Sequence, residues 1–184
     1  MAFSYYNREL CGSECEISKE DFVAGWVLYE KSVGRLRDRK VLISSLVFLF
    51  AASVIFLVGG MINFVVAALT AIISLCAIVY FWRILPKKVC ETAEFIYEKG
   101  KDIFAKQNLT VTCEGFIYEN RYEKISGFWS ETAFLAQDNN YFVFCENRDR
   151  NILILRKNSV GKEKIGEISD KLKEIFYGRN RYFN

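Results

Sequence analysis

The sequence contains no histidine and only one proline, and no charged residue occurs between Val41 and Trp82. The absence of histidine removes the side chain most often used for acid–base catalysis near neutral pH and the commonest nitrogen ligand of metals. The sequence also has no glycine-rich phosphate loop and no nucleophile elbow, and its carboxylates are scattered among lysines. We therefore expect a protein that is not an enzyme, with no catalytic residue, no metal and no cofactor.

Six cysteines are present, and Cys11 and Cys15 are separated by three residues. That spacing is compatible with a metal ligand pair, but the chain has neither histidine nor a second close cysteine pair to complete a zinc site. We expect the cysteines to be free thiols, because five lie in segments that we place in the reducing cytoplasm and Cys76 lies in the apolar stretch.

The charge-free stretch predicts a transmembrane hairpin over residues 41–85. It is long enough for two crossings of about 20 residues each, which we place at about 41–59 and 63–83. The turn falls in Gly59-Gly60-Met61-Ile62-Asn63, which combines two glycines with the only asparagine of the stretch. Because the stretch contains no ionisable carboxylate, lysine, arginine or histidine, it does not favour a pump or a proton-coupled transporter.

Basic residues flank both ends of the predicted hairpin. They are Arg35, Arg37, Arg39, Lys40, Arg83, Lys87 and Lys88. The positive-inside rule therefore predicts a multi-pass protein of the cell membrane with both termini in the cytoplasm. The lipid bilayer is its first expected partner. The formal net charge of +3 gives no reason to expect a nucleic-acid partner.

Small residues recur on one face of each predicted span and allow close approach of two helices. They are Ser45, Ala52, Gly59, Ala67, Ala71 and Ser74. We interpret these stripes as packing of the hairpin against itself. The alternative is a homodimer or partner interface.

Two amphipathic helices are predicted on the cytoplasmic side. Residues 18–40 begin with a capping box, Ser18 to Asp21, and residues 86–107 follow Pro86, which should break or kink the chain at the membrane exit. We expect the two helices to form a stalk that packs Trp26 and Val33 against Ile96 and Ile103. The N-terminal segment, residues 1–17, has an aromatic run at 3–8 that predicts a short edge strand.

From Leu109 the apolar period changes to two, which is typical of strands. Successive runs separated by turns predict an antiparallel meander, followed by an amphipathic helix over about 162–177 and a tail at 179–184. The predicted fold class is a membrane α-helical hairpin plus an α+β domain. That domain, residues 108–178, is a small antiparallel sheet of pleckstrin-homology-like layout closed by the C-terminal amphipathic helix.

The order of elements resembles the YcxB-like bacterial membrane proteins. The resemblance is carried by the two adjacent spans, the basic Arg35-x-Arg37-x-Arg39-Lys40 run, the strand set with its closing helix, and Trp129-Ser-Glu131. It implies a cytoplasmic pleckstrin-homology-like domain on a two-helix hairpin in the bacterial inner membrane, with no catalytic residues to transfer. One departure is Leu155 before Arg156-Lys157, where members often have proline. The implied fold is compatible with this departure, but we do not carry a shared binding surface over to this chain.

We therefore expect a non-catalytic membrane protein whose cytoplasmic domain binds a protein, peptide or lipid partner. A surface for that partner could be formed by Phe128, Trp129, Tyr141, Arg148 and Arg150. The competing interpretation places Phe128 and Trp129 in the core. Alternative functions are self-immunity against a bacteriocin or toxic peptide, and an accessory subunit of a membrane transport complex.

Overall fold

The computed structural model describes residues 9–32, 35–60, 64–104, 106–146, 152–160, 162–177 and 182–183. The chain divides into two compact units. One is the helical segment 30–92. The other combines residues 1–29 with 93–184, so the helical segment is an insertion in the sequence of the second unit.

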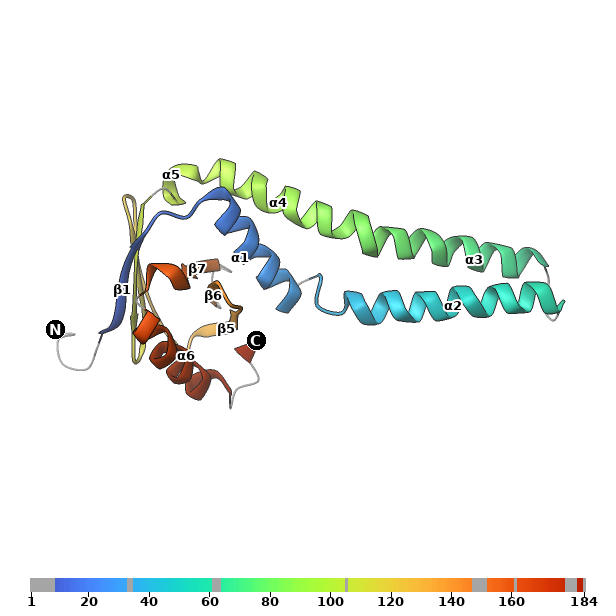
Figure 1. Cartoon of the computed structure of the whole chain (residues 1–184). Helices are drawn as coiled ribbons and strands as arrows, with labels where there is room; N and C mark the ends of the chain where they lie inside the picture. Colours follow the sequence, from blue (N-terminus) through green and yellow to red (C-terminus); the bar gives the residue numbers. More distant parts are fainter. Residues whose placement is uncertain are drawn as a thin grey trace. The chain divides into compact units, whose positions relative to one another are not determined.

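The helical unit is an antiparallel hairpin. Helix α2, Arg39–Gly59, and helix α3, Phe64–Val79, lie side by side (Figure 1) and correspond to the two predicted spans. Gly60 follows α2 with φ +62°, the left-handed conformation that glycine adopts easily at a helix end. Helix α2 and the continuous helical run Phe64–Lys99, which begins with α3, are long and apolar enough to cross a membrane. Over their most apolar stretches, only 6% and 11% of the residues are buried.

Small and hydroxylated residues line the interface between α2 and α3. Ser53, Ala67 and Ser74 are buried, and Ala52 and Ala71 are half-buried. In α2 the predicted stripe is out of register, because Ser45 and Gly59 are exposed. Ser53, which was not part of the predicted stripe, is the buried residue of α2.

The hydroxyl groups of the hairpin bond to their own helix. Ser53 Oγ donates to the Leu49 carbonyl at 2.8 Å, and Thr70 Oγ1 donates to the Val66 carbonyl at 2.9 Å. Ser74 Oγ donates to the Thr70 carbonyl in the same way. Such bonds remove the cost of placing a hydroxyl group in an apolar medium.

Of the two outcomes predicted at Pro86, a break or a kink, the break is wrong, because the helix continues through this residue. It passes from α3 through a π-helical turn, η1, Tyr80–Ile84, into α4, Leu85–Lys99. The Leu85 N–H donates to the Tyr80 carbonyl, so the pairing is already shifted by one residue when the chain reaches Pro86. Because a π turn offsets the i to i−4 ladder that proline disrupts, the helix can continue.

The predicted helix 18–40 is interrupted. Helix α1 covers Lys19–Ser32, and α2 begins only at Arg39. Arg35 closes this connection: its backbone N–H and guanidinium group both bond to the carboxylate of Glu30, the latter at 2.9 Å, and Glu30 is 4% exposed. A buried carboxylate with a guanidinium partner stabilises the turn that the amphipathic pattern did not predict.

The second unit contains two sheets. Strands β1, Glu9–Cys15, β2, Gln107–Thr112, β3, Gly115–Asn120, and β4, Lys124–Phe128, form an antiparallel sheet in that order, which we call sheet A. Sheet B has the order β7-β6-β5-β8, from Ile152–Arg156, Tyr141–Glu146, Thr132–Gln137 and Tyr182–Phe183. Strand β8 pairs with β5 in parallel, and the other pairs are antiparallel.

The N-terminal edge strand exists, but in a different place. The predicted strand at 3–8 lies outside the described residues, whereas β1 pairs with β2 through residues such as Ser13 with Leu109. The entire helical segment therefore lies between two strands that are neighbours in sheet A. The folded domain consequently begins before the hairpin, rather than at residue 108 as predicted.

Sheet B is buried on both faces. Alternate residues of β6 belong to different cores: Phe142 and Phe144 pack with sheet A and helix α6, Lys162–Tyr177, whereas Val143 and Cys145 pack with α1 and α4. In β7, Leu155 packs in the core with sheet A and α6, and Ile154 packs in the core with α1 and α4. Opposite faces of a strand are reached by successive side chains, so an unbroken apolar run suits a strand in a middle layer.

Helix α1 and the end of α4 thus cover a sheet, and the predicted stalk is wrong in that respect. Ile17 and Phe22 pack with Ala93 and Tyr97 against sheet B, and Phe22 contacts Phe104 of the short helix α5, Lys101–Phe104. The expected neighbourhood of Trp26, Ile96 and Ile103 is present, because all three line one cavity. Val33, the fourth residue of that prediction, lies outside the described residues.

Gly115 is expected to be intolerant of any side chain. A Cβ atom at this position would lie 2.0 Å from the Gly127 carbonyl oxygen, which is backbone of the paired strand β4. Because the ladder would have to open, we expect Gly115→Ala to lower the free energy of unfolding by about 3 kcal/mol. Urea unfolding measures the loss.

Gly166 supplies the matched control. A Cβ there meets nothing within 4 Å, and the residue is inside helix α6. Alanine exceeds glycine in helix propensity by about 1 kcal/mol, so Gly166→Ala should stabilise the protein. Equal effects of the two substitutions would contradict the close approach at Gly115.

Candidate binding site

A polar cluster forms around the first turn of α1. The predicted capping box is confirmed: the Asp21 N–H donates to Ser18 Oγ at 3.1 Å, and the Ser18 N–H donates to Asp21 Oδ2 at 3.3 Å. These bonds satisfy backbone donors that a helix start leaves without partners. They also hold the Asp21 carboxylate in place at the start of the helix.

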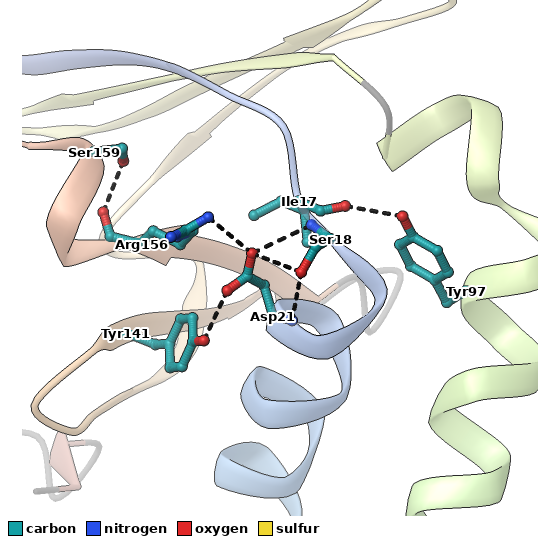
Figure 2. Close-up of polar contacts among 7 residues, drawn as sticks. All are labelled: Ile17, Ser18, Asp21, Tyr97, Tyr141, Arg156 and Ser159. Atoms are coloured by element: carbon teal, nitrogen blue, oxygen red, sulfur yellow. Dashed lines mark hydrogen bonds and ion pairs between the residues drawn. The ribbon is translucent and has the colours of Figure 1, made fainter.

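The same carboxylate receives two groups from sheet B (Figure 2). Tyr141 of β6 donates its hydroxyl to Asp21 Oδ1 at 2.8 Å, and Arg156 at the end of β7 donates from Nη1 to Asp21 Oδ2 at 3.0 Å. The Asp21 side chain is 10% exposed and that of Arg156 is 39% exposed. We call Ser18, Asp21, Tyr141 and Arg156 the Asp21 cluster; it joins α1 to sheet B.

Two more contacts secure α1 on its other side. Tyr97 of α4 donates its hydroxyl to the Ile17 carbonyl at 3.0 Å (Figure 2), and burial raises the pKa of this tyrosine. Lys19 lies 3.2 Å from Glu94 and 3.3 Å from Glu98, and hydrogen bonds to these carboxylates raise the pKa of the lysine. The start of α1 is thereby held between α4 and sheet B.

Tyr141 is a weak acid in this environment. Burial, followed by the hydrogen bond and negative charge of Asp21, raises its pKa from 10.0 to about 12. The folded state therefore holds this proton more tightly than the unfolded state does. The resulting stabilisation is complete below about pH 10 and is lost as the pH rises towards 12.

We expect this effect to distinguish Tyr141→Phe from the wild type. The difference between their free energies of unfolding should be constant from pH 7 to 9 and should shrink between pH 10 and 12. Urea unfolding at each pH measures it. A difference that grew with alkalinity would contradict the contact between the Tyr141 hydroxyl and Asp21.

An apolar cavity lies beside the cluster, at the place where the edge strands of the two sheets face helices α1, α4 and α5. Its volume is about 320 Å³. The lining residues come from α1, both sheets and the segment around α5; they are Ile17, Phe22, Trp26, Ile96, Ile103, Phe104, Gln107, Tyr118, Glu123, Ile125, Ile152, Leu153 and Ile154. Pockets of 300–1,000 Å³ with mainly apolar walls are typical of small-molecule sites.

Trp26 lines this cavity and carries a buried nitrogen. Its indole ring packs against Phe22 at 5.9 Å and Tyr29 at 5.8 Å between ring centroids. Within the described part of the chain, its Nε1 is the one buried side-chain nitrogen or oxygen atom without a hydrogen-bond partner. An unmet buried donor costs about 1–3 kcal/mol. Because water cannot touch this atom, it lies behind the cavity wall and does not face the cavity.

A second hollow of about 600 Å³ lies on sheet A near the β3–β4 turn. Its walls carry charges of both signs, among them Glu14, Asp102, Lys106 and Arg121. Nearby, Asn120 Oδ1 accepts from the Tyr122 N–H at 2.7 Å, which shapes the turn. The mixed charges favour no particular ligand charge.

The predicted partner surface is not assembled as a unit. Trp129 is 3% exposed and lies in the core, where its Nε1 donates to the Thr112 carbonyl at 3.0 Å; the surface interpretation of this residue is wrong. Phe128 is 47% exposed at the end of β4, and Tyr141 is half-buried in the Asp21 cluster on the other sheet. Arg148 and Arg150 lie outside the described residues.

The flanking basic residues take different positions. The exposed ones are Arg37, Lys40, Arg83, Lys87 and Lys88; Arg39 is half-buried, and Arg35 forms an ion pair with Glu30.

Among the cysteines, Cys76, Cys90, Cys113 and Cys145 are free thiols, whereas the side chains of Cys11 and Cys15 lie outside the described part. The described residues contain no group of three or more potential metal ligands.

Sequence reasoning missed the Asp21 cluster and the unmet Trp26 donor. Asp21 was identified only as a helix cap, because its partners are 120 and 135 residues away. The unbroken apolar runs of β6 and β7 could have indicated the contact with α1, because such runs are typical of a sheet that is buried on both faces.

The chain was compared with protein-family models, with curated proteins and with solved structures, and no match was found in any of the three.

Proposed function

We propose that this chain is a non-catalytic membrane protein whose two-sheet domain binds a protein, peptide or lipid partner at the inner membrane surface. The observation that carries the proposal is the insertion of an apolar helical hairpin between the paired strands β1 and β2. A domain built around such an insertion is connected to the hairpin through two chain segments. This arrangement suits a binding module that must stay at a membrane.

Exposure of the hairpin supports its place in the bilayer. Large apolar side chains on its outer surface are not covered by other residues of the chain; Phe48, for example, is 78% exposed and Val58 is 83% exposed. Soluble proteins rarely leave contiguous apolar surface of this kind uncovered. The exposed basic residues beside both helix ends support a cytoplasmic position for the domain.

The order of elements in the domain supports the pleckstrin-homology-like and YcxB-like assignments. Two mainly antiparallel sheets, formed by successive strands, enclose a core that includes Ile168, Leu172 and Phe176 of the C-terminal helix. By analogy of fold alone, such a domain serves binding rather than catalysis.

The polar groups support a non-catalytic role. Asp21 and Arg156 form an ion pair between distant segments in which the Asp21 side chain is 10% exposed, and they contact each other and Tyr141. Phe128 is the exposed aromatic residue of the predicted surface, and Tyr122 adds a second one at 60% exposure in the β3–β4 turn. We place the partner surface along β4, with these two residues at its ends.

Two measurements test the proposal. The protein should remain in the membrane fraction after alkaline carbonate extraction, and a tag after Asn184 should be accessible only after permeabilisation. A photo-crosslinking residue at position 128 should then give a discrete adduct in cells, whose mass distinguishes lipid from protein. The matched control is the same replacement at Phe95, which is 60% exposed on α4.

Release of the protein by carbonate, or access to the tag in intact cells, would contradict the membrane placement. Equal adducts at positions 128 and 95, or none at either, would contradict a binding surface along β4.

A further inference from the structure

We infer that the open edge of β4 pairs with the same edge of a second copy of this chain, antiparallel and centred on Ser126. This inference deepens the proposed binding surface along β4 and rests on it. Two copies of one edge form a closed, twofold-symmetric pair, which is the commonest symmetry among protein assemblies. The partner that we assign to the surface is thus another copy of the chain.

The register of β3 and β4 shows which backbone groups of β4 are open. The Asn120 N–H donates to the carbonyl of the directly opposite residue, Glu123, at 2.9 Å, and the bond at the far end of this hairpin follows the same register. Bonded and non-bonded pairs alternate along an antiparallel ladder. The N–H and C=O groups of Lys124, Ser126 and Phe128 therefore point away from β3.

These outward groups lie at an exposed edge. Lys124 and Ser126 are exposed, Phe128 is 47% exposed, and β4 pairs with β3 alone among the described strands. Within the described part of the chain, the Phe128 carbonyl is the one outward backbone group with a bond, which it accepts from the Glu131 N–H at 2.9 Å and the Thr132 hydroxyl at 3.2 Å. The remaining groups can bond to a strand from outside.

The other edges of the two sheets are protected. Strand β7 is buried at Leu153, Ile154 and Leu155, and β8 has only two residues. Strand β1 has an irregular register between Glu9 and Cys11. Burial, short length and bulges are common means by which proteins prevent pairing at sheet edges. Among the described edge strands, β4 alone combines exposed residues with a regular ladder of more than two residues.

The side chains of this edge are complementary to themselves. A lysine on an edge strand deters pairing, but the charge of Lys124 is balanced by Glu119, whose Oε2 lies 2.9 Å from the lysine Nζ. In a pair centred on Ser126, Lys124 lies directly opposite Phe128 of the second copy, on the same face of the extended sheet. An ammonium group beside an aromatic ring is favourable, and the small Ser126 side chain leaves room at the symmetry axis.

The pair uses the open backbone groups. The Ser126 N–H of each copy donates to the Ser126 carbonyl of the other, and the Phe128 N–H donates to the Lys124 carbonyl of the other. None of these bonds needs the Phe128 carbonyl, which already has partners. The edge of one short strand buries little surface, so the pair is weak in dilute solution. Two hairpins in one membrane raise the effective concentration of the edges, and we therefore expect the pair in membranes.

Cysteine cross-linking of the full chain in membrane vesicles tests the pairing. Directly opposite, bonded residues of antiparallel strands have Cα atoms about 5.5 Å apart, which is within the range of a disulfide. We expect Ser126→Cys to form a covalent dimer under mild oxidation, well above the background that the native cysteines give in the wild type. Ser130→Cys is the matched control, because Ser130 is also exposed but lies far from its own copy in this pairing.

Mixed cross-linking tests the register. Chains that carry Lys124→Cys and Phe128→Cys, with different tags, should form a mixed dimer, because the two positions lie opposite each other. Phe128→Cys should cross-link much less with itself, since the two copies of that position are about 13 Å apart along the strands.

Ser126→Pro tests the hydrogen bonds. The Ser126 N–H does not bond to β3, and proline is tolerated at such positions of an edge strand. When it is added to both cysteine chains, the mixed dimer should decrease about 10-fold, the equivalent of the symmetric pair of hydrogen bonds at Ser126. An unchanged urea midpoint shows that the variant is folded. If it does not fold, the comparison of the Lys124→Cys and Phe128→Cys chains decides the inference by itself.

The inference is overturned if Ser126→Cys gives no more dimer than the wild type or Ser130→Cys, or if Phe128→Cys pairs with itself as readily as with Lys124→Cys. A folded Ser126→Pro variant that retained the mixed dimer would also overturn it. A photo-adduct at position 128 that contained a lipid or a different protein would overturn this inference and leave the binding surface along β4 in place. Release of the protein by carbonate would contradict the membrane placement whatever the cross-links show, so the failures are distinguishable.

Discussion

A chain that begins at residue 108 will not fold. It contains β3 to β8, α6 and all of β2 except Gln107, but it lacks the edge strand β1 and the helices that cover sheet B. Ala136, Val143, Cys145 and Ile154 would then expose their face to water in place of packing on Ile17, Phe22, Ala93 and Tyr97. We expect this fragment to show unprotected amides in hydrogen exchange and to aggregate.

The control retains the N-terminal cover and removes the hairpin. Residues 9–32 are joined to residues 90–184 by a flexible linker, which is feasible because Trp26 of α1 and Ile96 of α4 line the same cavity. This chain should be monomeric in water with protected β6 amides. Stable folding of the fragment 108–184 would show that β1 and α1 are dispensable, and would overturn the domain boundaries derived from sheet A.

Replacement of Asp21 by alanine should lower the free energy of unfolding by about 3 kcal/mol. The substitution removes the carboxylate that accepts from the Ser18 N–H, accepts from the Tyr141 hydroxyl and pairs with Arg156. The bond from the Asp21 N–H to Ser18 Oγ remains. Hydrogen bonds to a charged group are worth about 1.5–3 kcal/mol and a cap about 1 kcal/mol, but the half-buried Arg156 can regain water, which limits the loss. Urea unfolding in mild detergent, followed by near-ultraviolet circular dichroism, measures it.

Asp170→Ala is the matched control, because Asp170 is on the surface of α6 with a side chain that is 81% exposed. Its pair with Lys173, at 3.9 Å, should contribute less than about 0.5 kcal/mol. Asp21→Asn retains a side-chain oxygen that can accept from the Ser18 N–H. Its loss of unfolding free energy should therefore lie between the losses for Asp21→Ala and Asp170→Ala. Equal losses for Asp21→Ala and Asp170→Ala would show that the Asp21 cluster does not hold α1 on sheet B.

Patterns within a few neighbouring residues were sufficient to predict most of the helices and strands. The two apolar spans, the capping box at Ser18 and the C-terminal helix follow from interactions within a few residues, so periodicity predicts them. The strands of the domain are also recognisable, because turn residues such as those at Asp138-Asn139-Asn140 separate runs of alternating or apolar residues. Trp129 was harder to place, because its burial depends on sheet packing rather than on its neighbours.

The sequence by itself determined an apolar helical hairpin, a mainly antiparallel domain and a closing helix, since these depend on the period of side chains along the chain. Only the tertiary structure decided that the domain starts before the hairpin, that α1 covers sheet B, and that Asp21 meets Tyr141 and Arg156. These features join residues about 100 or more positions apart. Nothing in a local pattern specifies which distant face will cover an apolar strand, because burial of any complementary surface satisfies the hydrophobic effect equally well.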